Sequence, residues 1–311
     1  MRRVIILIGL LIVAWLVISE VRAGNAPVGQ GSDSLTPLQR EIEHQRQRLS
    51  SKEAEERRDA LMRLGNLKRP EASRAAAVGL NDIAPIVRVT AAHAILSLPQ
   101  EEAARLLIPL LQDKSEFVRR ETAYALGVTR SRSATQPLVN LLIGDREVGV
   151  RAAAAIALGQ IRDEAAVSAL SQVLTVTEQT QKKKKAKARE NEFVMRAAAR
   201  SLGQIRSRDS VAILIATLEN ETVANDVRRE AATALGLIGD SSAVPALRAA
   251  FVSNDPYLSE AAREALRRLG AVVIDALCVI DREAGGSEAL AAKGIRLRPL
   301  FRMSELKDAA A

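Results

Sequence analysis

The sequence predicts an all-α protein, a right-handed α-α superhelix (solenoid) of about seven stacked helix pairs. Three observations support this fold class: an internal repeat with a period near 32 residues, a composition dominated by Ala, Leu and Arg, and an aromatic content of 2%. Ala, Leu and Arg lose little free energy on entering a helix. Aromatic and β-branched residues, which fill the pleated surfaces of sheets, are scarce, so a β-sandwich is disfavoured.

The chain begins with a pattern typical of an export signal. Two arginines after Met1 precede an apolar run from Val4 to Ile18, and small residues follow up to Ala23. Residues 1–23 are therefore expected to be a signal peptide cleaved after Ala23 or an uncleaved signal anchor, because the run is only slightly shorter than a spanning helix. Either alternative places the body outside the cytoplasm, secreted, periplasmic or anchored by this segment. Residues 24–35, rich in Gly, Ser and Asn, are expected to be a flexible linker.

The internal repeat defines the body of the protein. The string VRRETAYALG at 118–127 returns as VRAAAAIALG at 150–159 and as VRREAATALG at 227–236, and four weaker copies are present. Counted from the second residue of each string, the copies begin at 57, 88, 119, 151, 195, 228 and 259. A second apolar helical stretch precedes each copy, so each repeat is predicted to be a helix pair, with a first and a second helix.

A glycine stands at the same place near the end of most copies. In this position it is expected to end the second helix in the left-handed conformation that glycine adopts readily. The glycines in question are Gly65, Gly127, Gly159, Gly203 and Gly236.

The paired helices, the period and the closing Leu-Gly resemble the HEAT-repeat family, in particular the short HEAT-like repeats of the phycobilisome-lyase type. The resemblance covers residues 36–270 and implies a solenoid whose second helices line a concave side, where extended partners lie. Such a resemblance identifies a fold and not an activity.

An arginine stands at the start of five copies, and the helical wheel directs it into the packed face. The resemblance implies that an Asp six residues earlier, in the turn between the two helices, joins such arginines into a ladder between successive repeats. A partly buried Arg requires a carboxylate partner, so this column is interpreted as structural and not as a phosphate-binding stripe. The ladder is expected to lapse at Met195 and Ser259 and to contain Asp82, Arg88, Asp113, Arg119, Asp145 and Arg151.

The solvent arc of the second helices is the candidate binding surface. An exposed Tyr and Ile among arginines are residue types that anchor protein interfaces. The predicted partner is therefore a protein or peptide, held on the concave face by His93, Arg120, Tyr124, Ile156, Arg196, Arg200 and Arg229.

A basic insert at 177–191 lengthens one repeat by about twelve residues. It has no apolar period and is predicted to be a solvated loop. As an alternative function, the loop would bind an anionic membrane surface or an anionic polymer. Its basic residues are Lys182, Lys183, Lys184, Lys185, Lys187 and Arg189.

Catalysis finds little support in the sequence. The two histidines, His44 and His93, belong to different helix pairs, and Cys278 is the single cysteine, so no metal or cofactor site is predicted. The net charge of +8 is concentrated near the N-terminus and in the basic insert, which makes a nucleic-acid partner a poor expectation. The predicted function is a non-catalytic scaffold, and a lyase-type enzyme or enzyme subunit is a further alternative.

The repeat pattern decays after residue 270. Residues 271–311 are expected to form a capping helix, within the stretch VVIDALCVI, followed by a tail without a functional interpretation. A solenoid needs such a cap because its terminal repeat would otherwise expose an apolar face.

Overall fold

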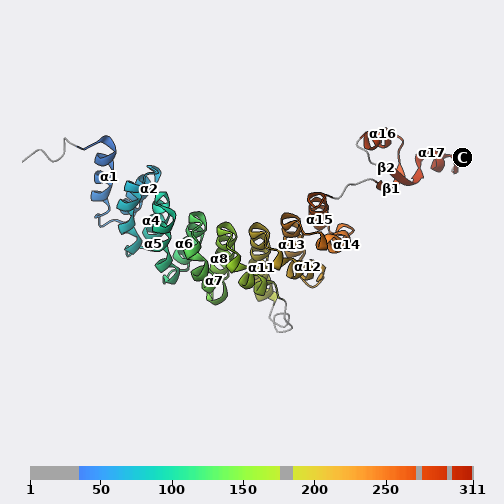
Figure 1. The fold of residues 1–311 in the computed structure, drawn as a ribbon. Coiled ribbons are helices and arrows are strands. Elements are labelled where there is room, and N and C mark those ends of the chain that lie inside the picture. Colours follow the sequence, from blue (N-terminus) through green and yellow to red (C-terminus); the bar gives the residue numbers. More distant parts are fainter. Residues whose placement is uncertain (1–34, 176–184, 271–274, 293–295, 310–311) are drawn as a thin grey trace, which may run out of the picture. The chain divides into compact units, whose positions relative to one another are not determined.

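The computed structural model describes residues 35–175, 185–270, 275–292 and 296–309 (Figure 1). The chain divides into two compact units, residues 1–41 and 42–311, and the boundary falls within the first helix. The predicted signal segment lies outside the described residues, as does the linker up to residue 34. Of unit 1 the structure therefore describes only the beginning of that helix.

Helix pairs follow one another along the chain, which confirms the all-α solenoid (Figure 1). Two of the first helices, α3 and α5, continue as single 3₁₀ turns, η1 (Ala77–Asn81) and η3 (Ile108–Gln112). The first helices of the pairs are α1 (Pro37–Arg48), α3 (Pro70–Ala76), α5 (Gln100–Leu107), α7 (Thr135–Gly144), α9 (Val167–Leu174), α12 (Val211–Glu219) and α14 (Val244–Phe251). The second helices are α2 (Ala54–Asn66), α4 (Pro85–Ala94), α6 (Glu116–Thr129), α8 (Val148–Ile161), α11 (Lys185–Ile205), α13 (Asn225–Ile238) and α15 (Pro256–Arg268).

The core lies between the two layers of helices and along the row of second helices, each of which contacts the next. Small side chains let these helices approach closely, and a leucine one turn later fills the space toward the first helices. In α6, Ala123 and Leu126 are fully buried, and Ala155 and Leu158 take the same positions in α8. Stability therefore comes from stacking, since a single pair cannot bury the sides of its helices that face the neighbouring pairs.

The predicted role of the repeated glycines is wrong. Gly65, Gly127, Gly159, Gly203 and Gly236 lie inside the second helices, and none has a positive φ. The left-handed residues stand three positions later, for example Arg130 with φ 56° and Gly239 with φ 80°.

The glycines are instead required by helix packing. A Cβ placed on Gly203 would lie 2.7 Å from the Cα of Ala234, and one on Gly236 would lie 2.7 Å from the Cα of Ala265. Only glycine allows the backbones of neighbouring second helices to come this close. In the second repeat Leu96 takes the glycine position, and there α4 ends at Ala94 and continues as the 3₁₀ turn η2 (Ile95–Ser97).

The predicted basic loop is in part a helix. Helix α11 begins at Lys185, so Lys185, Lys187 and Arg189 belong to its first turns. Lys, Ala, Arg and Glu are strong helix formers, and the segment KAKARENEF extends the helix without an apolar period of its own. Lys182, Lys183 and Lys184 lie outside the described residues.

The predicted capping helix is also wrong. Residues 275–281 form strand β1 (Asp275–Asp281), which pairs in parallel with β2 (Arg296–Arg302). Helix α16 (Gly286–Ala291) lies between the strands in the sequence, and α17 (Met303–Ala309) follows them. The stretch DALCVID contains an uninterrupted apolar run that ends in the β-branched residues Val and Ile, which is consistent with a strand.

The end of the helical stack is closed by α15 itself. Its exposed face carries ion pairs one turn apart, Arg263 with Glu260 at 2.6 Å and Arg267 with Glu264 at 3.2 Å. A polar outer face is what a terminal repeat needs, so no further helix is required after α15.

Candidate functional site

A ladder of arginine–aspartate pairs joins the first four repeats at the turns between first and second helices. Arg88 donates two hydrogen bonds to the carboxylate of Asp113, from Nε at 2.7 Å and Nη2 at 2.7 Å. Its Nη1 donates to the carbonyl oxygen of Asp82, at 2.8 Å, in its own turn. Equivalent pairs are formed by Arg57 with Asp82 and by Arg119 with Asp145, both with Nε–Oδ2 distances of 2.6 Å.

The ladder is largely removed from solvent, with exposed fractions of 14% for the Arg88 side chain and 11% for that of Asp113. The hydrogen bonds from Arg57 lower the pKa of Asp82. Burial alone would raise the pKa of Asp113, but the hydrogen bonds from Arg88 and from the Ser115 amide hold it below its ordinary value. These side chains satisfy one another, so they are structural groups.

The sequence predicted that Arg151 belongs to the ladder and that the ladder is interrupted at Met195 and Ser259. Arg151 donates to the carbonyl oxygens of Asp145 and Arg146 in its own turn. The position 25 residues further along falls in the segment outside the described residues. At the last lapse a different bond is found, from the Ser259 hydroxyl to the carbonyl oxygen of Phe251, at 2.6 Å.

The candidate binding residues all lie on the second helices, but their environments differ from the expected ones. Tyr124 and Ile156 are half-buried and not exposed. His93 is exposed, with Nε2 at 3.6 Å from the carboxylate of Glu121. The predicted pair of apolar anchors is therefore less accessible than the helical wheel indicated.

The four candidate arginines all have carboxylate neighbours. Arg200 makes two hydrogen bonds to Glu230 of the next repeat, at 3.0 and 3.3 Å. Arg196 and Arg229 both approach Asp226, at 3.4 and 2.8 Å. Arg120 lies 3.2 Å from Glu121. The face is thus charge-paired and is not an open basic patch.

Three aromatic residues that sequence reasoning missed stand two positions before the start of the repeat motif. The guanidinium of Arg120 lies 5.5 Å from the ring centroid of Phe117, and Arg196 lies 5.5 Å from that of Phe193. Arg229 lies 5.8 Å from the ring of Tyr257 in the next repeat. These are cation–π distances. The sequence contains this pattern, because the aromatic residue stands about one helical turn before the arginine, as Phe193 does before Arg196.

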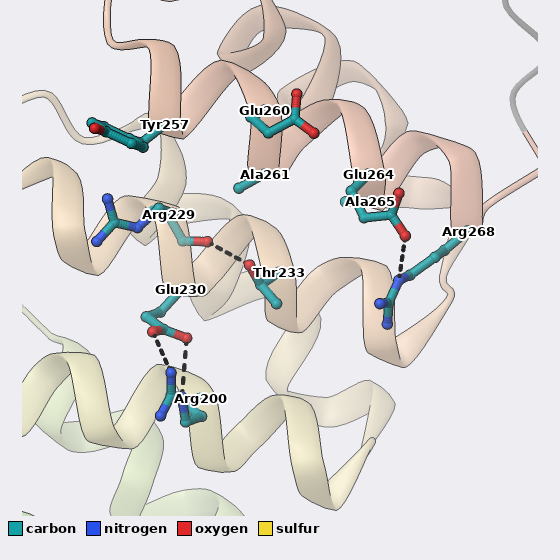
Figure 2. Close-up of a pocket in the computed structure, with 10 residues that line it drawn as sticks. All are labelled: Arg200, Arg229, Glu230, Thr233, Tyr257, Glu260, Ala261, Glu264, Ala265 and Arg268. Atoms are coloured by element: carbon teal, nitrogen blue, oxygen red, sulfur yellow. Dashed lines mark hydrogen bonds and ion pairs between the residues drawn. The ribbon is translucent and has the colours of Figure 1, made fainter.

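A groove lies where this aromatic–arginine pattern reaches α11, α13 and α15 (Figure 2). It has a cavity volume of about 450 Å³. In Figure 2, Arg229 and Tyr257 stand at one end of the groove and Arg268 at the other, with Thr233 and Ala261 between them. The Tyr257 side chain is the accessible apolar element, since 69% of the residue is exposed. Three arginines and three glutamates line the groove, so neither sign of charge dominates.

Within the described residues, no group of three His, Cys, Asp or Glu side chains is arranged to hold a metal ion. No helix in the described part of the chain is long and apolar enough to cross a membrane.

Stacked helix pairs, joined by a buried ion-pair ladder, define an α-solenoid of short helical repeats. The family comparison makes this specific: the sequence model of HEAT repeats matches residues 42–127, 106–186 and 182–267. The chain therefore belongs to the HEAT-repeat family.

One solved structure with a TM-score above 0.5 agrees on the fold. The X-ray structure of the Escherichia coli protein YibA has a TM-score of 0.51 and 22% identity, over 75% of this chain and 82% of YibA. The complex of CpcE and CpcF of phycocyanin lyase from Nostoc has a TM-score of 0.44 and 24% identity, over 80% of this chain and 90% of that one.

A short stretch of the chain is similar to another class of protein. The orotate phosphoribosyltransferase of Thermoplasma volcanium is 57% identical over 42 residues, and that of Methanoculleus marisnigri is 58% identical over 45 residues. Each match spans 14% of this chain and about a quarter of the enzyme, 25% and 26% respectively.

Proposed function

We propose that the protein is a non-catalytic interaction scaffold that binds a protein or peptide on the face of its second helices. The observation that supports this most directly is the groove over α11, α13 and α15, with the accessible ring of Tyr257 at its end. Aromatic residues flanked by Arg are the commonest anchors of protein interfaces. The face also presents ion pairs that a partner can exchange at little cost, because exposed pairs contribute about 0–1 kcal/mol.

Photo-crosslinking from the groove tests this proposal. Tyr257 is replaced by p-benzoylphenylalanine in the full chain, and a matched variant carries the same group at Arg248, an exposed residue on the first helix α14. The expected result is one crosslinked protein from position 257, retained at high salt, and none from position 248. Equal crosslinking from both positions would contradict binding on this face.

The alternative function is binding of an anionic partner by charge, and it depends on the basic residues at the start of α11. Lys185, Lys187 and Arg189 share its first turns, and basic clusters attract anionic headgroups. This alternative predicts binding that disappears at high salt and that does not depend on Tyr257. Glutamine at these three positions separates the two functions, since it should leave crosslinking from position 257 unchanged.

We also propose that the repeats work outside the cytoplasm, on the strength of the residues up to Ala23. Reporter fusions after residue 270 test the location. Alkaline phosphatase, which is active only when exported, should be active in the fusion, and removal of Val4–Ile18 should abolish that activity. An active fusion without the apolar run would contradict export through this segment.

We infer that the similarity to orotate phosphoribosyltransferases lies at the C-terminal end. The HEAT-repeat match ends at residue 267, and the remaining 44 residues, 268–311, have the length of the matched stretch. They also contain the parallel strands β1 and β2, which no helical repeat supplies. Two strands taken from a quarter of an enzyme do not transfer its activity. The segment is proposed to be a separate module appended to the scaffold.

A further inference from the structure

The turn that leaves each second helix contains a residue with an unusual backbone. It stands eleven positions after the start of the repeat motif and has a left-handed conformation in every repeat but the second, where Pro99 takes the place. Two repeats have glycine there, and four have a basic residue. The φ angles are 50° for Lys68, 56° for Arg130, 59° for Arg162, 63° for Arg206, 80° for Gly239 and 83° for Gly270.

A residue with a Cβ is disfavoured in this conformation, and glycine is the residue that adopts it freely. Gly239 and Gly270 demonstrate that the fold accepts glycine at the position. The basic residues therefore occupy this position against a conformational preference. Their charge is favourable at a helix C-terminus, but a basic residue inside the last turn would supply the same benefit without the left-handed backbone.

None of the four basic residues has a side-chain partner among the described residues, and three of them are arginines in consecutive repeats. Arg130, Arg162 and Arg206 are exposed, and their guanidinium groups form no hydrogen bond or ion pair with the described residues. Glu164 and Asp209 lie on the same turns without pairing with them. This contrasts with the second-helix face, where the arginines are paired, as Arg200 is with Glu230.

The three side chains follow one another along one edge of the stack. Helices α6, α8 and α11, whose ends they occupy, are consecutive and in contact. Packed helices are about 8–10 Å apart, and the glycine contacts at Gly127 and Gly159 favour the short end of that range. The backbone positions of the three arginines are therefore expected to recur at the spacing of the helices, about 8–10 Å. A polyproline II segment rises about 3.1 Å per residue with three residues per turn, so every third side chain returns to one face after about 9 Å.

We propose that Arg130, Arg162 and Arg206, the arginine row, bind an acidic protein segment in the polyproline II conformation with a carboxylate at every third residue. Arg pairs with carboxylates through two parallel hydrogen bonds, and the chain itself uses this geometry between Arg88 and Asp113. The row lies at the ends of the second helices and not on their face. It is therefore a second interaction surface, independent of the groove.

The test uses the full chain in mild detergent and a fluorescent peptide, (Glu-Pro-Pro)₃, with binding followed by anisotropy. An isomer with the three glutamates adjacent has the same charge but the wrong spacing. The test variant is Arg130→Gly, Arg162→Gly, Arg206→Gly, whose turns already suit glycine. The control variant, Arg63→Gln, Arg263→Gln, Arg267→Gln, removes the same charge from exposed arginines engaged in pairs along their own helices.

The spaced peptide should bind at least about tenfold more tightly than its isomer, and the glycine variant should lose this preference, while the control changes affinity less than about twofold. The melting temperature of the glycine variant should be equal to or above that of the native chain, which separates loss of binding from loss of folding. Equal binding of both peptides, or equal losses in both variants, would overturn the proposal in favour of net charge alone. Competition by millimolar inorganic phosphate would overturn it in favour of a phosphate ligand. Crosslinking from position 257 should be unaffected, so either proposal can fail without the other.

Discussion

Single side chains join one repeat to the next. Arg88 holds two carbonyl oxygens of its own turn and the carboxylate of Asp113 in the following one. Asp113 in turn accepts a hydrogen bond from the Ser115 amide and so fixes the turn that begins α6. One buried carboxylate thus orders a turn and a repeat interface together.

Acid should weaken the stack through these carboxylates. The pKa values of Asp82, Asp113 and Asp145 are lowered in the folded chain, so their contribution is complete above the unfolded pKa near 3.9 and is lost as the pH falls through the lower folded values. The free energy of unfolding should be nearly constant from about pH 7 to about pH 5 and fall below about pH 4. Urea unfolding at a series of pH values measures it.

Asp113→Asn serves as the comparison for that titration. It should be less stable by about 3 kcal/mol at neutral pH, because Arg88 keeps its buried charge without a charged partner. Its stability should also fall less steeply in acid. If the free energy of unfolding of the variant falls with pH as steeply as that of the native chain, carboxylates other than Asp113 govern the acid response.

The helix glycines make a second prediction at this scale. Gly203→Ala places a methyl group 2.7 Å from the Cα of Ala234, so the helices must separate, at a cost of about 1–3 kcal/mol that exceeds the gain in helix propensity. Gly144→Ala is the matched control, because nothing lies within 4 Å of its Cβ position. Thermal unfolding should show a loss for the first and no loss for the second. A loss in both would point to a backbone effect in place of a steric one.

At the scale of elements, the helix pairs could be predicted from the sequence because the repeat marks them seven times over. The end of the chain could not, because a short apolar run such as ALCVI within DALCVID fits a short helix and a buried strand alike, and the choice depends on pairing with Arg296–Arg302. The start of α11 was misjudged because polar helix formers leave no apolar period.

The candidate site could also be predicted only in part. The columns that face outward were readable from the helical wheel, and the arginines do lie on the second helices. Their pairing with Glu230 and Asp226 depends on the neighbouring repeat, about 30 positions away, which a wheel drawn for one helix does not contain.

Removal of residues 271–311 tests whether the stack needs a cap. The melting temperature of the repeats should change by less than about 3 °C, because α15 already presents ion pairs to solvent. Removal of residues 244–311 is the comparison, since it uncovers buried Leu235 and Ala231 of α13 and should lower the melting temperature distinctly. A large loss in the shorter deletion would restore a capping role to the C-terminal module.

At the scale of the whole molecule, the repeats are held together in two ways. The early repeats share the buried Arg–Asp ladder, whereas the later ones are joined by more exposed pairs such as Arg200 with Glu230. In a repeat protein each unit is stabilised only by its neighbours, so local differences persist along the chain. Stability should therefore be unequal along the stack.

Hydrogen exchange should detect this difference. Amides of α13 and α15 are expected to exchange faster than those of α6 and α8, because the ion pairs between the later repeats, such as Arg200 with Glu230, are more exposed than the ladder pair of Arg119 with Asp145. Mass spectrometry of peptides from native exchange gives the order. Faster exchange of α6 than of α13 would show that the ladder contributes little to local stability.

The leucine that stands in the glycine position of the second repeat affects how the chain would bear a load. Where a glycine allows the backbones of two second helices to come into contact, a pulling force is distributed over the whole length of both helices. At Leu96 the α-helix has already ended, and the chain continues as a narrow 3₁₀ turn. The contact between α4 and α6 is therefore short and offers the least resistance to sliding of the two helices. Pulled from its two ends, the stack should first yield between α4 and α6, as soon as the Arg88–Asp113 pair that joins them breaks, and divide into a short leading piece and a longer trailing one that extends later.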